Sequence, residues 1–149
     1  MRTAIILVID DDEDVRVTLG EDLVSSGHIP VFAEEAQEAV EAARFQLPDL
    51  ILLDLRFPGG GGLEVLQQLQ ESPATSGIPV IVFSGQKSET LVAEALRLGA
   101  RTYVQKSFTS TRLNEAIEKL LAKDPVPAPA LAMPVPLRHL QVFLGGAAA

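Results

Sequence analysis

The chain has 149 residues, of which 20 are acidic and 12 basic, giving a formal net charge of −8. This length suits one ordinary domain, and the 47% hydrophobic content excludes disorder throughout the chain. Cysteine is absent and only two histidines are present, which excludes a disulfide scaffold, a thiolate metal site and a histidine-rich metal site.

The charge and the apolar pattern also limit the partners and the location to be expected. An acidic chain repels the phosphate backbone, so we expect no direct contact with nucleic acid. No apolar run is long enough to span a bilayer, so we expect no membrane insertion. The start of the sequence lacks the basic region and cleavage site of a signal peptide, and we therefore expect a cytoplasmic protein.

Apolar runs alternate with segments of helical period along residues 1–123. Three continuous apolar runs are typical of parallel strands covered on both faces, and two weaker runs predict further strands. The five predicted strands are 4–9, 30–33, 50–53, 79–83 and 102–105. Apolar residues with helical spacing predict five helices, within 15–23, 36–43, 63–69, 91–98 and 113–121. This order predicts an α/β fold with a parallel sheet, right-handed crossovers and helices on both faces.

The composition changes near residue 124, because five of the ten prolines lie between residues 125 and 136. We interpret residues 1–123 as the domain and 124–149 as a Pro/Ala-rich tail that begins with an extended linker. We expect the short apolar segment in this tail to dock on protein, and we favour a neighbouring subunit, which would give a homodimer. Its anchoring side chains would be Leu137, Leu140, Phe143 and Leu144 if the segment is helical, or Leu140, Val142 and Leu144 if it is a strand.

Carboxylates follow two of the predicted strands. Asp10 and Asp11 come directly after the first strand, and Asp54 closes the third. Because the carboxyl ends of parallel strands meet at one edge of a sheet, we expect these three side chains to lie close together. Three adjacent carboxylates repel one another unless a cation joins them, and hard oxygen ligands suit Mg²⁺. The sequence therefore predicts a magnesium site at this edge.

A hydroxyl and an ammonium group follow two further strands. Ser84 ends the fourth apolar run, and Lys106 comes after the fifth. Taken alone, each is explained as a turn residue or a surface lysine. Together with the carboxylates they predict a phosphoryl site, in which Asp54 is the nucleophile, Ser84 donates a hydrogen bond, and Lys106 and Mg²⁺ neutralise phosphoryl oxygens.

Four stretches of the sequence resemble the receiver domain of two-component response regulators. They are residues 6–16, 48–59, 79–85 and 99–106, and the resemblance extends from residue 4 to about residue 121. It implies a flavodoxin-like, doubly wound (βα)5 fold with strand order 2-1-3-4-5. It also implies a phosphorelay receiver that depends on Mg²⁺ or Mn²⁺ and is no enzyme beyond self-phosphorylation and slow autodephosphorylation. Its implied partners are a sensor histidine kinase or a phosphotransfer protein, and a downstream protein target.

The resemblance assigns a role to each residue of the acidic site. Asp54 matches the phosphoacceptor. Asp10 and Asp11 match the acidic pair that holds the metal, and Asp11 is the more direct ligand of the two. The backbone carbonyl of Arg56 occupies the position that completes the metal site.

The resemblance also implies a conformational switch. Lys106 matches the lysine that contacts the phosphoryl group, Ser84 the switch hydroxyl and Tyr103 the switch aromatic. Phosphorylation is then expected to draw Ser84 inward and to let Tyr103 turn in behind it. The change would be read on the face formed by the fourth helix, the fifth strand and the fifth helix.

Three features of the sequence depart from the usual pattern of the family. Ser107 follows the lysine where a proline is common, so the turn there is either strained or rebuilt. Four glycines, 59–62, fill the loop after the acceptor, and we expect that loop to be mobile. Arg56 places a long cation beside the acceptor, and the sequence does not decide its effect on hydrolysis.

Other readings remain to be compared. The chain could be the receiver module of a hybrid histidine kinase, a truncated longer regulator, or a degenerate receiver that serves only as a binding module. An aspartate-nucleophile phosphatase is disfavoured because no substrate-cap insertion is present. A calcium-binding loop starting at Asp10 is rejected because Val15 replaces its required glycine.

Overall fold

The computed structural model describes residues 3–56, 61–85, 89–106 and 110–123, with the backbone alone for Ser84, Ser110 and Lys123. The chain divides after Glu118, and the five strands belong to the first unit. The strands are β1 (Ile5–Ile9), β2 (Ile29–Ala33), β3 (Leu50–Asp54), β4 (Val80–Ser84) and β5 (Thr102–Gln105). The helices are α1 (Glu13–Ser25), α2 (Ala36–Gln46), α3 (Gly62–Glu71), α4 (Glu89–Arg97) and α5 (Ser110–Lys123).

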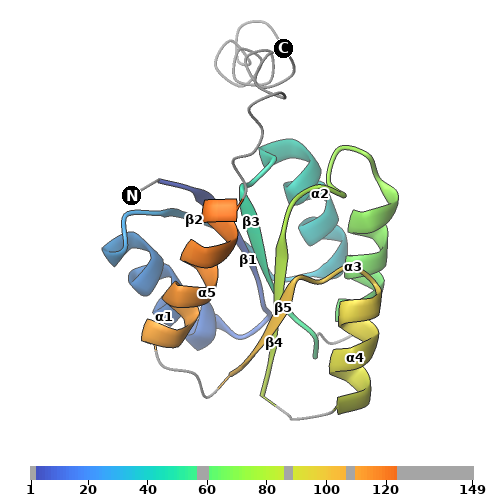
Figure 1. The fold of residues 1–149 in the computed structure, drawn as a ribbon. Helices are drawn as coiled ribbons and strands as arrows, with labels where there is room; N and C mark the ends of the chain where they lie inside the picture. The colour runs from blue at the N-terminus through green and yellow to red at the C-terminus, as the bar shows by residue number, and fades with distance from the viewer. Residues whose placement is uncertain (1–2, 57–60, 86–88, 107–109, 124–149) are drawn as a thin grey trace, which may run out of the picture. The chain divides into compact units, whose positions relative to one another are not determined.

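All five strands are parallel and lie in the order β2-β1-β3-β4-β5 (Figure 1). The predicted α/β fold with strand order 2-1-3-4-5 is therefore confirmed. The register pairs Ile9 of β1 with Leu53 of β3, so the next residues, Asp10 after β1 and Asp54 at the end of β3, lie side by side. Asp54 in turn pairs with Phe83 of β4. The alignment of these strand ends places the two carboxylates next to each other.

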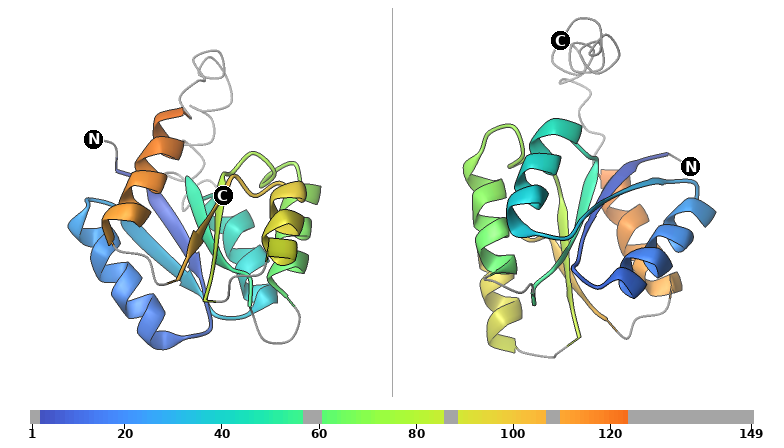
Figure 2. Two further views of the ribbon diagram at one scale, coloured as in Figure 1. Left: turned by 60° about the horizontal axis from the view of Figure 1, so that its bottom comes forward. Right: turned by 180° about the vertical axis from the view of Figure 1, so that it is seen from behind.

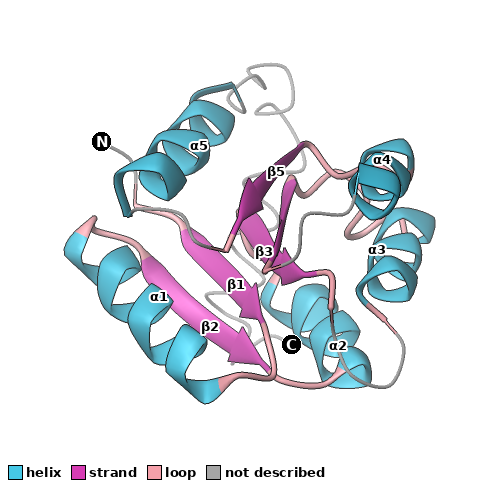
Figure 3. Cartoon of the chain, turned by 90° about the horizontal axis from the view of Figure 1, so that it is seen from below, coloured by secondary structure: helices cyan, strands magenta, loops and turns pink. Residues whose placement is uncertain are grey.

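Helices cover both faces of the sheet, as the alternating pattern predicts. α1 and α5 lie on one face, and α2, α3 and α4 lie on the other (Figure 3). The two views of Figure 2 show the same two layers from other sides, with α1 beside the edge strand β2. Every residue of β3 is buried, because it is a central strand covered from both sides. On the face of α2, α3 and α4, one cluster joins strand residues Leu7, Ile9, Ile51, Leu53, Val80 and Val82 to helix residues Val40, Leu66 and Leu69.

The start of α1 is fixed by its own acidic sequence. Asp12 is the N-cap, and its side chain accepts hydrogen bonds from the backbone N–H groups of Asp14 and Val15. Glu13 and Asp14 in the first turn complement the positive end of the helix dipole. Part of the acidic run is thus explained by helix capping, and Asp10, Asp11 and Asp54 are left to be explained by the site.

The tail and its predicted docking segment, residues 124–149, lie outside the described residues. The mobile loop predicted for the four glycines falls partly on residues 57–60, which also lie outside them. Of the helices that the structure describes, none combines the length and the apolar character needed to cross a membrane.

Candidate functional site

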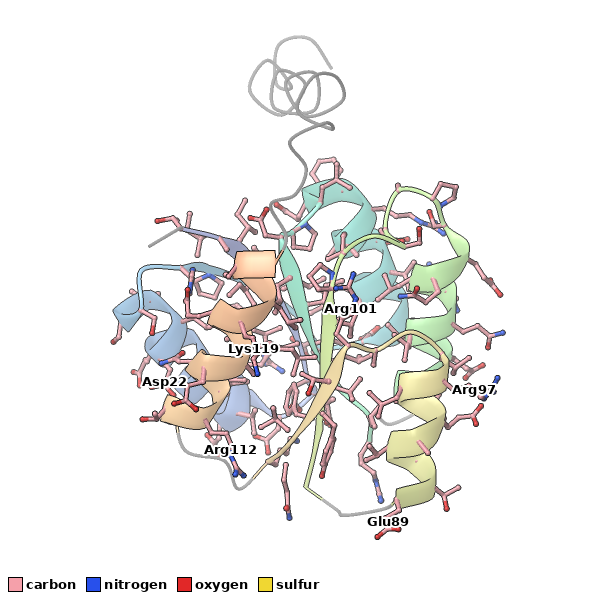
Figure 4. All side chains as sticks on the ribbon, in the orientation of Figure 1. Asp22, Glu89, Arg97, Arg101, Arg112 and Lys119 are labelled. Carbon is pink, nitrogen blue, oxygen red and sulfur yellow. The ribbon has the colours of Figure 1, made fainter. Side chains whose placement is uncertain are left out.

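The three predicted carboxylates meet at the carboxyl edge of the sheet. Asp10 and Asp54 are 0% and 2% exposed, whereas Asp11 is exposed. Each of the three offers a carboxylate oxygen, and these oxygens all lie within 4.8 Å of one another. Among the described residues, Asp10 and Asp54 are the only buried carboxylates. Other charged side chains lie at the surface, such as Glu89 and Arg97 of α4 (Figure 4).

Backbone N–H groups hold one oxygen of each buried carboxylate. The N–H of Asp12 donates to Asp10 Oδ1 at 2.9 Å, and the N–H of Arg56 donates to Asp54 Oδ1 at 2.9 Å. In both cases the donor lies two residues after the aspartate, so the loop that leaves the strand folds back over its own carboxylate. The second oxygen of each group, Oδ2, remains available on the side of Lys106.

Lys106 lies between the two buried carboxylates. Its Nζ is 3.0 Å from Asp10 Oδ2 and 3.3 Å from Asp54 Oδ2, and it lies 5.5 Å from the centre of the Phe83 ring. It donates a hydrogen bond to Asp54. Its contact with Asp10 is an ion pair without hydrogen-bond alignment, so Asp10 Oδ2 accepts no hydrogen bond from any described residue. The single positive charge of Lys106 therefore compensates two buried carboxylates.

This imbalance shifts the pKa values of the cluster. Burial raises the pKa of Asp10, and the nearby charge of Asp54 adds to that rise. Burial acts to lower the pKa of Lys106, but its contacts with Asp10 and Asp54 outweigh burial and leave it raised. Lys106 therefore stays protonated, and Asp10 is the carboxyl that burial makes costly to ionise.

The donor set fits a hard divalent cation. All three groups are carboxylates, and Asp10 Oδ2 is buried with an unused acceptor capacity. An additional positive charge at this point would offset the excess negative charge that Lys106 leaves. Asp10, Asp11 and Asp54 are the residues that would hold it.

The remaining predicted site residues are Ser84, Tyr103 and Arg56, and the structure describes only part of their surroundings. The backbone of Ser84 ends β4 and pairs with Gln105, but its side chain lies outside the described residues, as do Ser107 and residues 57–60. Tyr103 on β5 is half-buried against the core, and its hydroxyl is covered without a hydrogen-bond partner among the described residues. Arg56 is exposed, and its backbone N–H already serves Asp54.

Residues 6–118, including all of these positions, match the family described as the response regulator receiver domain. The chain belongs to this family. The resemblance drawn from the sequence motifs is therefore confirmed, and the chain is a receiver of two-component signalling.

Two curated relatives and one solved structure illustrate the similarity. The receiver is 30% identical to the alkaline phosphatase synthesis transcriptional regulatory protein PhoP of Bacillus subtilis, over 94% of this chain and 58% of PhoP. It is 29% identical to sporulation initiation phosphotransferase F of the same organism, over 78% of this chain and 92% of that protein. A CheY-like receiver domain protein from Methanospirillum hungatei has the same fold, with a TM-score of 0.77 and 24% identity over 82% of this chain and 96% of that one. The receiver spans only 52–58% of the first curated relatives, PhoP and the PhoB proteins.

Sequence reasoning missed Gly62, which the structure places directly against the backbone of β3 and the residue after it. A β-carbon on Gly62 would lie 2.6 Å from the carbonyl oxygen of Asp54 and 2.6 Å from the Cα of Leu55. Both are backbone atoms, so they cannot turn away as a flexible side chain would. Nothing in a run of four glycines distinguishes the one that faces a strand, so only the structure could identify it.

Gly62→Ala is therefore expected to lower the free energy of unfolding by about 2 kcal/mol, as overpacking against rigid backbone does. The loss should occur although alanine favours a helix more than glycine does. Gly77→Ala is the matched control, because a β-carbon there meets nothing within 4 Å. Urea unfolding of both variants checks this, and equal midpoints for the two would contradict it.

Asp10→Asn is expected to stabilise the metal-free receiver at neutral pH, because it removes a buried charge whose ionised form burial disfavours. Because the pKa of Asp10 is raised, the fold binds a proton at this group more tightly than the unfolded chain does, so stability falls as pH rises through the folded pKa. The advantage of the variant should therefore shrink as pH is lowered. Urea unfolding in chelator at several pH values measures it, with Asp11→Asn as the exposed control, and a destabilised Asp10→Asn would refute the expectation.

Proposed function

We propose that this receiver accepts a phosphoryl group on Asp54 and changes its protein contacts in response. The observation that carries the proposal is the pairing of a 98% covered strand-end carboxylate with Lys106, beside two further carboxylates that can hold a cation. A carboxylate in this setting can act as a nucleophile, because Lys106 and a cation held by the three carboxylates would together supply the positive charge needed to receive a phosphoryl group.

The chemistry is a displacement at phosphorus. A carboxylate oxygen of Asp54 attacks the phosphorus of the donor and forms the P–O bond of an acyl phosphate. The bond between phosphorus and the donor's imidazole nitrogen, or the acyl oxygen of a small donor, breaks with its electron pair going to the leaving atom. Lys106 supplies positive charge next to the transferred group, since its Nζ already lies 3.3 Å from Asp54 Oδ2. Water later attacks phosphorus, the bond between phosphorus and the Asp54 oxygen breaks, and inorganic phosphate leaves as the carboxylate is restored.

Asp10, Asp11 and Asp54 would hold Mg²⁺ or Mn²⁺, with the backbone carbonyl of Arg56 as a further ligand. When bound, the cation neutralises charge on the phosphoryl oxygens and on the attacking carboxylate. The N–H of Asp12 holds Asp10 Oδ1, so Oδ2, which has Lys106 Nζ at 3.0 Å but accepts no hydrogen bond from a described residue, can serve as a ligand without rearrangement of the loop.

The phosphoryl donor in this proposal is a sensor histidine kinase or a phosphotransfer protein, and a downstream protein reads the result. One relative, sporulation initiation phosphotransferase F, is named as a phosphotransferase, which supports a role in phosphoryl transfer. Turnover of an external substrate is not part of the proposal, which limits catalysis to self-phosphorylation and slow autodephosphorylation. The chain matches only 58% of the length of PhoP, as a module of a longer regulator or of a hybrid kinase would.

The readout proposed for the phosphorylated state is the α4–β5–α5 face. Ser84 would move towards the phosphoryl group, and Tyr103 would turn towards the space it leaves. A switch of this kind only shifts an existing equilibrium between two arrangements of the same packed elements. The Tyr103 side chain is half-buried and its hydroxyl has no hydrogen-bond partner among the described residues. Both features support a side chain that can change between two orientations.

Intact-mass analysis with acetyl phosphate tests the proposal. The chain is expected to gain one phosphoryl group in the presence of Mg²⁺ and none after chelation with EDTA. Peptide mapping after borohydride trapping should then locate the modification at Asp54. A chain that takes up no phosphoryl group from acetyl phosphate or from phosphorylated kinases would instead be a degenerate receiver that acts only as a binding module.

A further inference from the structure

Arg16 on α1 connects two loops at the edge of the acidic site. Its Nη1 donates a 2.8 Å hydrogen bond to the backbone carbonyl of Asp10, and its Nη2 lies 3.7 Å from Glu34 Oε2 in the loop between β2 and α2. The Arg16 side chain is only 17% exposed, whereas that of Glu34 is 61% exposed. The hydrogen bond to Asp10 is thus the more protected of the two contacts.

This hydrogen bond completes the anchoring of the backbone at Asp10. The N–H of Asp10 donates to the carbonyl of Ala33 at 3.1 Å, and Arg16 holds its carbonyl. A peptide unit is planar, so a fixed carbonyl of Asp10 also fixes the N–H and the Cα of Asp11. The two hydrogen bonds of the Asp10 backbone, to Ala33 and from Arg16, therefore also fix the position of the Asp11 backbone.

Asp11 needs such an anchor because its own side chain has none. The structure gives its exposed carboxylate no hydrogen bond or ion pair with a described residue, yet an oxygen of it lies within 4.8 Å of oxygens on Asp10 and Asp54. Without a cation, repulsion from two buried carboxylates favours a turn of Asp11 towards solvent. A loop free to follow that turn would have to be reordered each time a cation bound, at a cost in affinity.

We propose that Arg16 is a positioning residue for the cation site, which it preorganises by holding the Asp10–Asp11 peptide unit in place. It contacts no cation and no phosphoryl group itself. The inference rests on the proposed metal-dependent function, and it adds a residue outside the acidic set to the site. Glu34 steadies the guanidinium from the second loop.

Removing Arg16 would affect cation affinity in two opposite ways. The direction of the measured change therefore distinguishes a positioning role from a purely electrostatic one. Loss of a positive charge near a cation site would by Coulomb's law tighten cation binding. Loss of the anchor would weaken it. We expect Arg16→Met to raise the dissociation constant for Mg²⁺ roughly tenfold, as removal of a residue that orients metal ligands does.

Calorimetric titration of the full chain with MgCl₂ provides the test. Arg16→Lys keeps the charge and one donor, and it should fall between wild type and the methionine variant. Arg44→Met removes the same charge from an exposed position on α2 and should leave the Mg²⁺ affinity within twofold of wild type, since distant surface charges act weakly. Where the methionine variant does not fold, Arg16→Gln makes the same comparison.

A second measurement needs no cation. In the metal-free chain, Arg16→Met should speed amide hydrogen exchange at Asp12, whose N–H is bonded to Asp10 Oδ1, while Arg44→Met should not. Unchanged or tighter Mg²⁺ binding in folded Arg16→Met, with only a lower melting temperature, would overturn the inference and leave the proposed function intact. Wild-type chain without saturable Mg²⁺ binding would overturn both.

Discussion

Replacing Asp54 with asparagine is expected to abolish phosphoryl uptake by this receiver. The amide keeps the shape of the side chain and can still accept the hydrogen bond from the N–H of Arg56, so the loop after β3 should keep its course. What it loses is the negative charge and the nucleophilic carboxylate oxygen beside Lys106. Intact-mass analysis after incubation with acetyl phosphate and Mg²⁺ should show unmodified chain.

Asp14→Asn is the matched control for this experiment. Asp14 is an exposed aspartate in the first turn of α1 and is not one of the three clustered carboxylates, so the same chemical change there should leave phosphoryl uptake intact. Circular dichroism of both variants establishes that the fold is kept. If Asp54→Asn still gained a phosphoryl group, the acceptor would have to be another side chain, and the assignment of Asp54 would be wrong.

The strands and their polar ends could be predicted from the sequence because the central strands are covered on both faces. Such strands need continuous apolar runs, and the point where a run stops at an aspartate marks the edge of the sheet. The residue Asp54, which ends a completely buried strand, illustrates this: an acidic group in that position has no structural reason to be there. The grouping of Asp10, Asp11 and Asp54 followed from topology alone.

The features that could not be predicted from the sequence depend on strand register and on contacts between individual atoms. Which oxygen of Asp10 faces Lys106 depends on the turn that brings the N–H of Asp12 to the other oxygen. The role of Arg16 depends on the reach of its guanidinium to a backbone carbonyl, and backbone acceptors leave no trace in a sequence pattern. The close approach of Gly62 to β3 is likewise a backbone contact. The residue that caps the end of α2, Leu47, has a φ of 47°, although glycine is the residue expected at a left-handed cap.

Replacing Lys106 with methionine is expected to lower the free energy of unfolding by about 3 kcal/mol at neutral pH, the cost of leaving a buried charge without its partner. Methionine keeps much of the length of the side chain, and the contact of Nζ with the Phe83 ring at 5.5 Å is lost together with the charge, so the loss reports mainly on charge. The pKa of Lys106 is raised in the fold, so its contribution is present below its ordinary value of 10.5 and is lost as pH rises through the folded pKa. The difference from wild type should therefore fade in strongly alkaline solution.

Arg101→Met provides the control for charge and shape. Arg101 is an exposed cation directly before β5, and surface substitutions of this kind change stability by less than about 0.5 kcal/mol (Figure 4). Urea unfolding in chelator compares the two variants with wild type. A loss in Lys106→Met no larger than in Arg101→Met would show that water, rather than the lysine, compensates the buried carboxylates.

A double-mutant cycle then measures how strongly Asp10 and Lys106 depend on each other for their effects on stability. Once Lys106 is replaced, Asp10 lacks its ion-pair partner at 3.0 Å and keeps only the hydrogen bond from Asp12. Neutralising it by Asp10→Asn should then recover more stability in the Lys106→Met background than the same change adds to wild type. The sign of this coupling distinguishes a lysine that holds two buried carboxylates from one that merely lies near them. Equal effects of Asp10→Asn in both backgrounds would mean that Asp10 and Lys106 act independently, and that Asp54 alone determines the position of the lysine.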